Sequence, residues 1–417
     1  MPIFPGARRV PARPVRPSFG DPRFAFLLAG QSVSWVGSWA ASIVLWGFAA
    51  YHFGASPEAI SVTALCWSGP PIVFTAFTGR LTDRFGPRAM LIAGYLCSAT
   101  TSLGMAAAGS LMSLDIMAAA CGAARALCTP ASSALPARVV EPGDLLAANS
   151  LLSVTSSIGQ VAGPLAASVL MAVAGFRTAF AADAATYLVS VLVMLPLPVL
   201  PRPDQPRSAG PAATGRSARG VRWLRQAAAG AVPVARDRGL RRVTLARIGV
   251  IFTSGAFLVI EPLYARHVLG RPPSQFALFE AAIGAGAIVT GLALPVIRRR
   301  LPATRPALEV MAAGAISYGL TAALFTGTPW ILVAYIGAFA WGASGTVFYT
   351  VAATTLQRLA PAGTLGQVAG TISTAESTIE NLSMPLAGVL LAATGIRAGA
   401  LVLAAAAVAA GAGCLLK

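Results

Sequence analysis

Charged residues are scarce in this sequence. Only 11% of the 417 residues are charged and 56% are hydrophobic, whereas a soluble domain carries about 25% charged residues. A soluble chain of this length would form roughly two or three domains with charged surfaces. The deficit indicates that most of the surface faces something other than water.

Residues that bind metals or form disulfides are also few. The five cysteines lie inside apolar runs without a Cys-x-x-Cys pair, and the two histidines, His52 and His267, fall near the ends of predicted helices. Such cysteines behave as small apolar residues, and no metal-ligand spacing is present. We therefore expect no metal, no cofactor and no disulfide framework.

Lysine is nearly absent, because 30 of the 31 basic residues are Arg and the remaining one is Lys417. A net charge of +17 is typical of nucleic-acid-binding proteins, but these charges lie between apolar runs. If the N-terminus is cytoplasmic, 26 basic residues fall on the cytoplasmic side and four on the other, with Arg125 inside a helix. The positive-inside bias then places both termini in the cytoplasm, and no nucleic-acid partner is expected.

The apolar runs have the length of membrane spans. About 20 apolar residues in a helix cross the roughly 30 Å hydrocarbon core. Ser56-Pro57 and Thr328-Pro329 each place a hydroxyl before a proline and predict helix starts. Twelve segments qualify: 24–51, 58–78, 89–109, 112–135, 146–173, 178–198, 244–265, 275–297, 306–326, 329–352, 367–393 and 398–416.

The spans divide into two sets of six. Residues 1–23 lack the apolar core of a signal peptide and predict a disordered cytoplasmic tail. Residues 199–243 are rich in Pro, Gly and Arg and predict a cytoplasmic linker with a basic amphipathic segment. They separate an N-terminal bundle (24–198) from a C-terminal bundle (244–417).

The two bundles share a local pattern. The segment GPLAASVLMAVAGFR in the first half is echoed by MPLAGVLLAATGIR in the second, so that Pro164 corresponds to Pro385. The fold class we predict is an all-α membrane protein with twelve transmembrane helices in two pseudo-symmetric halves. Binding sites in such repeats lie near the bilayer midplane.

The segment GRLTDRFGPR lies between the second and third predicted spans. Gly79 would allow close helix approach and Gly86 a tight reversal, while Asp83 would form a charge cluster with Arg80, Arg84 and Arg88 at the cytoplasmic face. The segment resembles the signature of the major facilitator superfamily at the position where that family carries it. The resemblance implies that Asp83 latches the cytoplasmic face of the bundle in one of two states.

A second motif lies in the fifth predicted span. Gly159 and Gly163 are four residues apart, so they share a helix face on which another backbone can pack, and Pro164 removes a backbone hydrogen bond. The motif is similar to the antiporter pattern of the same superfamily, with Ala167 and Ser168 in place of its last glycines. The resemblance implies antiport.

Arg125 lies near the middle of the fourth predicted span, where an Arg is costly unless it finds partners inside the bundle. The superfamily places an Arg in this helix and links it to proton transfer. The surrounding RALCTPASSALPARVV, together with DAATYLVSVL in the sixth span, resembles the bacterial subfamily of enterobactin- and macrolide-type exporters.

Acidic residues inside spans are the remaining candidates for proton coupling or substrate binding. Glu376 and Glu380 lie one helical turn apart in the eleventh span, and two carboxylates at that spacing cannot both ionise cheaply in a low dielectric. Pairing with Arg125 or with a helix hydroxyl is an alternative role for them. Asp183, Glu261 and Glu280 lie nearer the outer ends of their spans, where they would either face a wet vestibule or carry protons.

Together these patterns predict a monomeric transporter in a bacterial cytoplasmic membrane. It would export a small molecule, such as an antibiotic, drug or secondary metabolite, by alternating access with proton antiport. Proton-coupled uptake and siderophore or metabolite transport remain alternatives, as does a sensor or scaffold that does not transport. An enzyme is not expected, because no catalytic cluster is visible. The substrate stays open.

Overall fold

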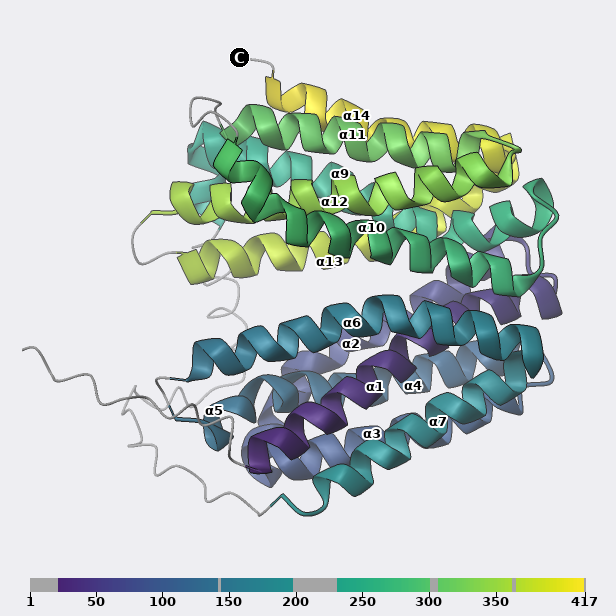
Figure 1. The fold of residues 1–417 in the computed structure, drawn as a ribbon, viewed down its shortest axis with the longest axis vertical. Coiled ribbons are helices and arrows are strands. Elements are labelled where there is room, and N and C mark those ends of the chain that lie inside the picture. The colour runs from purple at the N-terminus through teal and green to yellow at the C-terminus, as the bar shows by residue number, and fades with distance from the viewer. Residues whose placement is uncertain (1–21, 142–143, 198–230, 301–306, 362–364, 416–417) are drawn as a thin grey trace, which may run out of the picture.

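The described part of the chain is built from helices alone. The computed structural model describes residues 22–141, 144–197, 231–300, 307–361 and 365–415, and no strand occurs among them. The predicted tail and most of the predicted linker lie outside these residues. Within the described ranges, twelve helices have 20 residues or more, and they form two bundles stacked one above the other in Figure 1.

The first bundle, lower in Figure 1, contains six long helices and one short one: α1 (Pro22–Gly47), α2 (Pro57–Phe85), α3 (Pro87–Ala106), α4 (Leu111–Ala134), α5 (Pro136–Val139), α6 (Leu145–Val173) and α7 (Gly175–Met194). The second contains α9 (Arg238–Leu263), α10 (Pro273–Arg300), α11 (Ala307–Gly327), α12 (Ile331–Leu359), α13 (Leu365–Thr394) and α14 (Ile396–Leu415). The prediction of an all-α protein in two six-helix halves is confirmed.

Most of the long helices are suited to cross a membrane. Among the described residues, ten helices are long and apolar enough, and eleven if the two parts of α2, bent by 60°, count as one span. α13 is not in this set. Its middle carries Glu376, Glu380 and Asn381, and it packs against α2 and α9. A polar helix is tolerated at membrane depth where it faces protein or a water-filled cavity.

Local sequence explains where several helices begin. Ser56 caps α2 by accepting a hydrogen bond from the Ala59 N–H at 3.3 Å, as predicted. The corresponding prediction for Thr328 is wrong, because α12 begins only at Ile331. The Thr328 hydroxyl instead accepts from the Trp330 N–H at 3.1 Å, so it closes a local turn before the helix.

The two halves repeat their backbone turns. Gly175 ends the α6–α7 connection with φ of +79°, and Gly395 does the same between α13 and α14 with φ of +82°. Side chains with a Cβ rarely adopt this conformation. Likewise α1 and α9 both continue into a π-helical turn, η2 (Phe48–His52) and η3 (Tyr264–Val268). The sequence echo between the halves therefore reflects a structural repeat.

α2 extends further than the sequence suggested. It continues through most of GRLTDRFGPR to Phe85, and Gly86, with φ of +88°, is the single residue between α2 and α3. The polar residues of this segment favour a helix that projects beyond the apolar layer rather than a loop. α9 also begins early, at Arg238 instead of 244.

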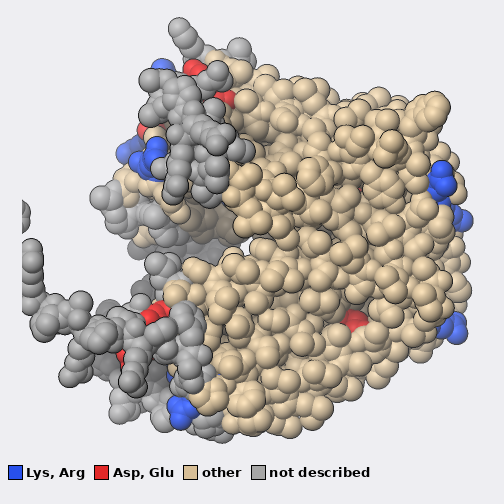
Figure 2. Space-filling model, in the orientation of Figure 1, with Lys and Arg blue, Asp and Glu red and all other residues tan. Residues whose placement is uncertain are grey.

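The two bundles contact one another mainly at the end remote from α5. There Ser168 on α6 donates a hydrogen bond to the Ser274 carbonyl on α10 at 2.8 Å. A Cβ added at Gly388 on α13 would lie 2.9 Å from the Pro57 carbonyl oxygen on α2. At the opposite end, on the left of Figure 2, the bundles part around a hollow. The structure is therefore closed at one end of the helices and open at the other.

The placement of Arg predicts which end faces the cytoplasm. In a cysteine-free background, we expect Arg271→Cys, before α10, to react with a membrane-impermeant maleimide on intact cells. Arg358→Cys, at the end of α12, should react only in inverted vesicles, because the positive-inside bias places that end in the cytoplasm. Both positions are exposed. The reverse labelling pattern would contradict the predicted topology.

Candidate functional site

A cavity of about 370 Å³ lies between the two bundles. Four tryptophans dominate its wall on the side of the first bundle, and α13 supplies most of the opposite wall. The lining residues are Trp35, Ser38, Trp39, Ser42, Trp46, Ala64, Trp67, Ser68, Pro71, Ile72, Arg125, Leu258, Ser377, Glu380, Asn381 and Met384. Two of them, Arg125 and Glu380, are charged.

Arg125 contributes to this wall from the middle of α4. Its guanidinium lies over the ring of Trp67, 4.6 Å from the centroid, a cation–π arrangement that stabilises a desolvated cation. Gly122, one turn earlier, makes this possible because a Cβ there would lie 2.7 Å from the Trp67 carbonyl oxygen. Neither Glu376 nor Glu380 forms an ion pair with Arg125.

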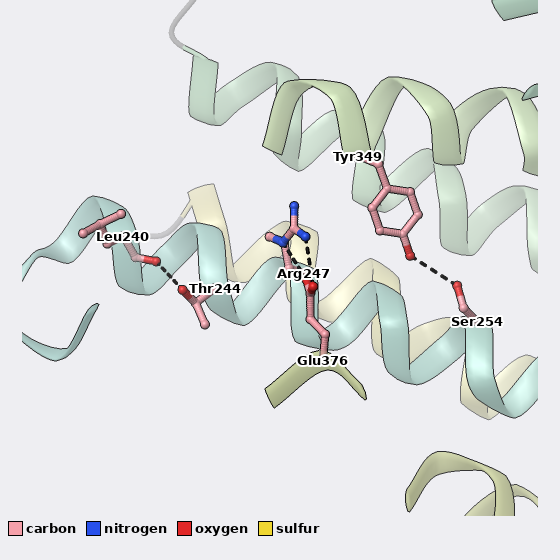
Figure 3. A network of polar contacts seen from close by, with 6 residues as sticks. All are labelled: Leu240, Thr244, Arg247, Ser254, Tyr349 and Glu376. Atoms are coloured by element: carbon pink, nitrogen blue, oxygen red, sulfur yellow. Dashed lines mark hydrogen bonds and ion pairs between the residues drawn. The ribbon is translucent and has the colours of Figure 1, made fainter. Parts of the chain in front are cut away.

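Glu376 is held by a residue that the sequence had assigned to the cytoplasmic side. Arg247, within α9, binds the carboxylate with two hydrogen bonds, from Nε at 2.5 Å and from a terminal nitrogen at 3.0 Å. Figure 3 shows the pair spanning α9 and α13. This bidentate geometry is the strongest form of Arg–carboxylate contact, so the charge of Glu376 is already neutralised.

Glu380 differs from Glu376 although it lies only one turn away. Its carboxylate has no ion pair or hydrogen bond to any residue that the structure describes. It is the sixteenth of the 30 residues of α13, which places it at mid-helix. α9 packs against it through Gly255, where a Cβ would lie 2.6 Å from the Glu380 carbonyl oxygen. An unpaired carboxylate therefore faces the cavity at mid-depth.

A hydrogen bond joins the two bundles beside this carboxylate. Ser68 on α2 donates to Asn381 Oδ1 at 2.7 Å, and Asn381 Nδ2 donates to the Ser377 carbonyl of its own helix at 2.8 Å. Because Ser68 and Asn381 belong to different bundles, this hydrogen bond would break if the bundles separated here in another state.

The remaining predicted acids lie inside the individual bundles rather than in a wet vestibule. Asp183 is 2% exposed and accepts from the Ser102 hydroxyl at 2.6 Å, in the core between α1, α3 and α7. Glu261 is also 2% exposed and lies among the buried residues of α9. Asp183 and Glu261 therefore do not face a wet vestibule in this conformation, and proton transfer stays the other role predicted for them.

The glycines of the second motif lie against α1. A Cβ at Gly159 would be 3.1 Å from Trp35 Cβ, and one at Gly163 would be 2.6 Å from Trp39 Cβ. α6 continues without a break through Pro164 to Val173. The absence of two side chains on α6 thus allows α1 to present Trp35 and Trp39 to the cavity.

The first motif lies at the open end. Asp83 is exposed and has no ion-pair partner among the described residues, and a Cβ at Gly79 would meet nothing within 4 Å. Arg84 lies over the ring of Phe85, while Arg88 donates to the Leu195 carbonyl at 2.8 Å. Among the described residues, this conformation therefore gives Asp83 no ion pair and Gly79 no close neighbour.

At the closed end, the π-helical turns of α1 and α9 meet. Arg266 in η3 donates a hydrogen bond to the Ala50 carbonyl in η2 and lies 5.9 Å from the centroid of the Tyr51 ring. π-helical turns occur frequently at functional sites. The sequence analysis had counted Arg266 only as a topological charge.

Arg247, Arg266 and Asn381 are the residues of this site that the sequence analysis missed. Arg247 follows directly on the Arg-rich segment, so its charge was indistinguishable from those outside the membrane. Among the described residues, no group of three or more His, Cys, Asp or Glu side chains could hold a metal ion.

The model of the Major Facilitator Superfamily matches residues 27–380, which is most of the chain. The chain belongs to this superfamily. It is 24% identical over 172 residues to an uncharacterised MFS-type transporter, YfiS, of Bacillus subtilis (strain 168), and the match covers 41% of each protein. The chain is therefore a multi-pass membrane protein of this transporter superfamily.

Solved structures support the major facilitator fold. A nucleoside transporter, NupG, aligns with a TM-score of 0.74 at 12% identity, covering 94% of this chain and 99% of its own. A peptide transporter of the POT type in complex with sulfate aligns with a TM-score of 0.72 at 15% identity, covering 94% and 93%. A bacterial homologue of the lysosomal transporter Spinster aligns with a TM-score of 0.70 at 15% identity, covering 94% and 96%.

The contact between α6 and α1 gives a test of the glycine motif. Gly163→Leu should lower the melting temperature of the purified protein by several degrees, because overpacking costs about 1–3 kcal/mol. Gly370→Leu is the matched control, since a Cβ at Gly370 meets nothing within 4 Å. Equal melting temperatures for the two variants would show that the motif is incidental spacing.

Proposed function

We propose that this major facilitator transporter exports a small molecule by proton antiport, with Glu380 as the coupling carboxylate. The observation that carries the proposal is the contrast within α13. Glu376 is bound by Arg247 through two hydrogen bonds, while Glu380 is unpaired and faces the cavity between the bundles. An intramembrane carboxylate without a partner is costly when charged, and a proton or a positively charged ligand removes that cost.

Alternating access gives such a carboxylate two environments. In this conformation the bundles are closed at the end that holds Arg266 and open at the end that holds Asp83. Under the predicted topology, the cavity then opens to the cytoplasm, where an exported molecule would enter. One of the solved relatives, the Spinster homologue, is described as inward-facing and occupied. Rocking of the two bundles would expose Glu380 to the other side.

The two sequence motifs fit this cycle. Gly159 and Gly163 hold α1 against α6, as expected for the antiporter pattern, and Asp83 lies at the open end, where a latch between the two bundles would form on closure. With the resemblance to enterobactin- and macrolide-type exporters, these features favour export across a bacterial cytoplasmic membrane. We propose that a monomer performs the cycle, since both halves of the cavity come from one chain.

Replacing Glu380 tests the coupling. In inverted vesicles with an acidified lumen, transported compounds should dissipate the pH gradient of the unmodified protein but not that of Glu380→Gln, because the amide cannot titrate. Glu376→Gln is the informative comparison. It should lower the yield of folded protein, because an unpaired Arg247 inside the bundle costs about 3–5 kcal/mol.

A panel of dyes, macrolides and siderophores would supply the compounds. If vesicles with the Glu380→Gln variant lose their pH gradient as fast as those with the unmodified protein, the coupling lies at another acid. Asp183, Glu261 and Glu280 are then the remaining candidates. If no compound dissipates the pH gradient, even with the unmodified protein, proton-coupled export of these molecules is contradicted.

The latch proposed for Asp83 has its own test. Asp83→Asn should leave the amount and fold of the protein unchanged, because the side chain has no ion-pair partner among the described residues in this state. Transport in proteoliposomes should fall by about tenfold or more if closure of the open end needs a charged pair at that site. Unchanged turnover would show that the charge of Asp83 takes no part in closure.

A further inference from the structure

We propose that the cavity between the bundles binds organic cations that carry a bulky apolar body. The positive charge would lie near Glu380 and the apolar body would pack on the indole rings of Trp35, Trp39, Trp46 and Trp67. The proposal rests on the transport function argued above and specifies its substrate class.

The charges around the cavity favour a cation. Two charged side chains line the cavity, Arg125 and Glu380. The neighbouring Glu376 is already paired with Arg247 at 2.5 Å, and the Arg125 guanidinium already lies over the Trp67 ring. Glu380 has no such contact among the described residues, so a cation is the ligand that would neutralise it.

The chemistry of the wall agrees with this charge. Indole has the most favourable ring for cation–π attraction, and cages of aromatic rings are used to recognise quaternary ammonium groups. Four indoles from α1 and α2 line a single cavity that has one unpaired carboxylate on the opposite wall. A small polar solute would leave these rings uncovered, whereas an apolar cation would cover the rings and neutralise the carboxylate.

Trp46 supplies a second, independent indication of a ligand. Its side chain lines the cavity and is 5% exposed, and its indole N–H has no hydrogen-bond partner among the described residues. Buried donors are normally satisfied, because leaving one unpaired costs free energy. A ligand with an acceptor oxygen or nitrogen near its apolar body would complete this bond.

The strongest opposing possibility is an anion bound by Arg125. The geometry disfavours it, since the guanidinium already has an aromatic face beneath it at 4.6 Å, whereas the Glu380 carboxylate has no ion pair or hydrogen bond among the described residues. Two probes of similar shape and opposite charge, tetraphenylphosphonium and tetraphenylborate, separate the two possibilities directly.

Binding of both ions to the purified protein in detergent can be measured by equilibrium dialysis without any pH gradient. We expect tetraphenylphosphonium to bind at least about tenfold more tightly than tetraphenylborate. Glu380→Gln should weaken tetraphenylphosphonium binding by about tenfold and leave tetraphenylborate binding unchanged or improved. Trp67→Ala should also weaken binding of the cation, while Trp330→Ala should not, because Trp330 is 72% exposed at the start of α12.

Tetraphenylborate binding equal to or tighter than that of the cation would overturn the proposal, as would tetraphenylphosphonium binding that is insensitive to Glu380→Gln. The outcome is separable from that of the antiport test. If the cation binds in a Glu380-dependent way but no compound dissipates a pH gradient, the proposed substrate class stands and proton antiport is contradicted. If only anions or neutral molecules are exported in exchange for protons, proton antiport stands and the proposed substrate class is contradicted.

Discussion

The high cost of a charge inside a low-dielectric bundle constrains the rest of this structure. Arg247 and Glu376 meet this constraint by pairing across α9 and α13. Arg125 meets it with the face of Trp67, and Asp183 with the hydroxyl group of Ser102. Glu380, the carboxylate that lines the cavity, has no ion pair or side-chain hydrogen bond in the described part of the chain. The function proposed here follows from that exception.

Packing of the helices brings these groups to their positions. Gly122 lets α4 approach α2 so that Arg125 lies on Trp67, and Gly255 lets α9 approach α13 beside Glu380. Gly163 has the same role between α6 and α1, where Trp39 borders the cavity. In a membrane, small residues allow close approach where hydrophobic burial supplies no driving force between helices. The glycines of this chain therefore shape the cavity as well as the fold.

The two bundles contact each other at one end of the helices and are separated at the other, and this difference defines the conformational state of the structure. At the closed end, Arg266 bonds to the Ala50 carbonyl and Ser168 to that of Ser274. At the open end, Asp83 has no described ion-pair partner and Gly79 faces open space. Alternation between two states requires that each state is stabilised by contacts that are broken in the other. The contacts at the closed end have this character, because no counterpart of them is formed among the described residues at the open end.

The sequence by itself determined the membrane class, the two six-helix halves and the superfamily, because apolar run length, Arg placement and short motifs are local properties of the chain. It also identified Glu376 and Glu380 as the mid-helix acids of α13. Only the tertiary structure decided between them, since the partner of Glu376 is Arg247, 129 positions away. Burial of Asp183 and Glu261 likewise depends on which helices surround them. Pairing and burial are relations between distant segments, and no local pattern records them.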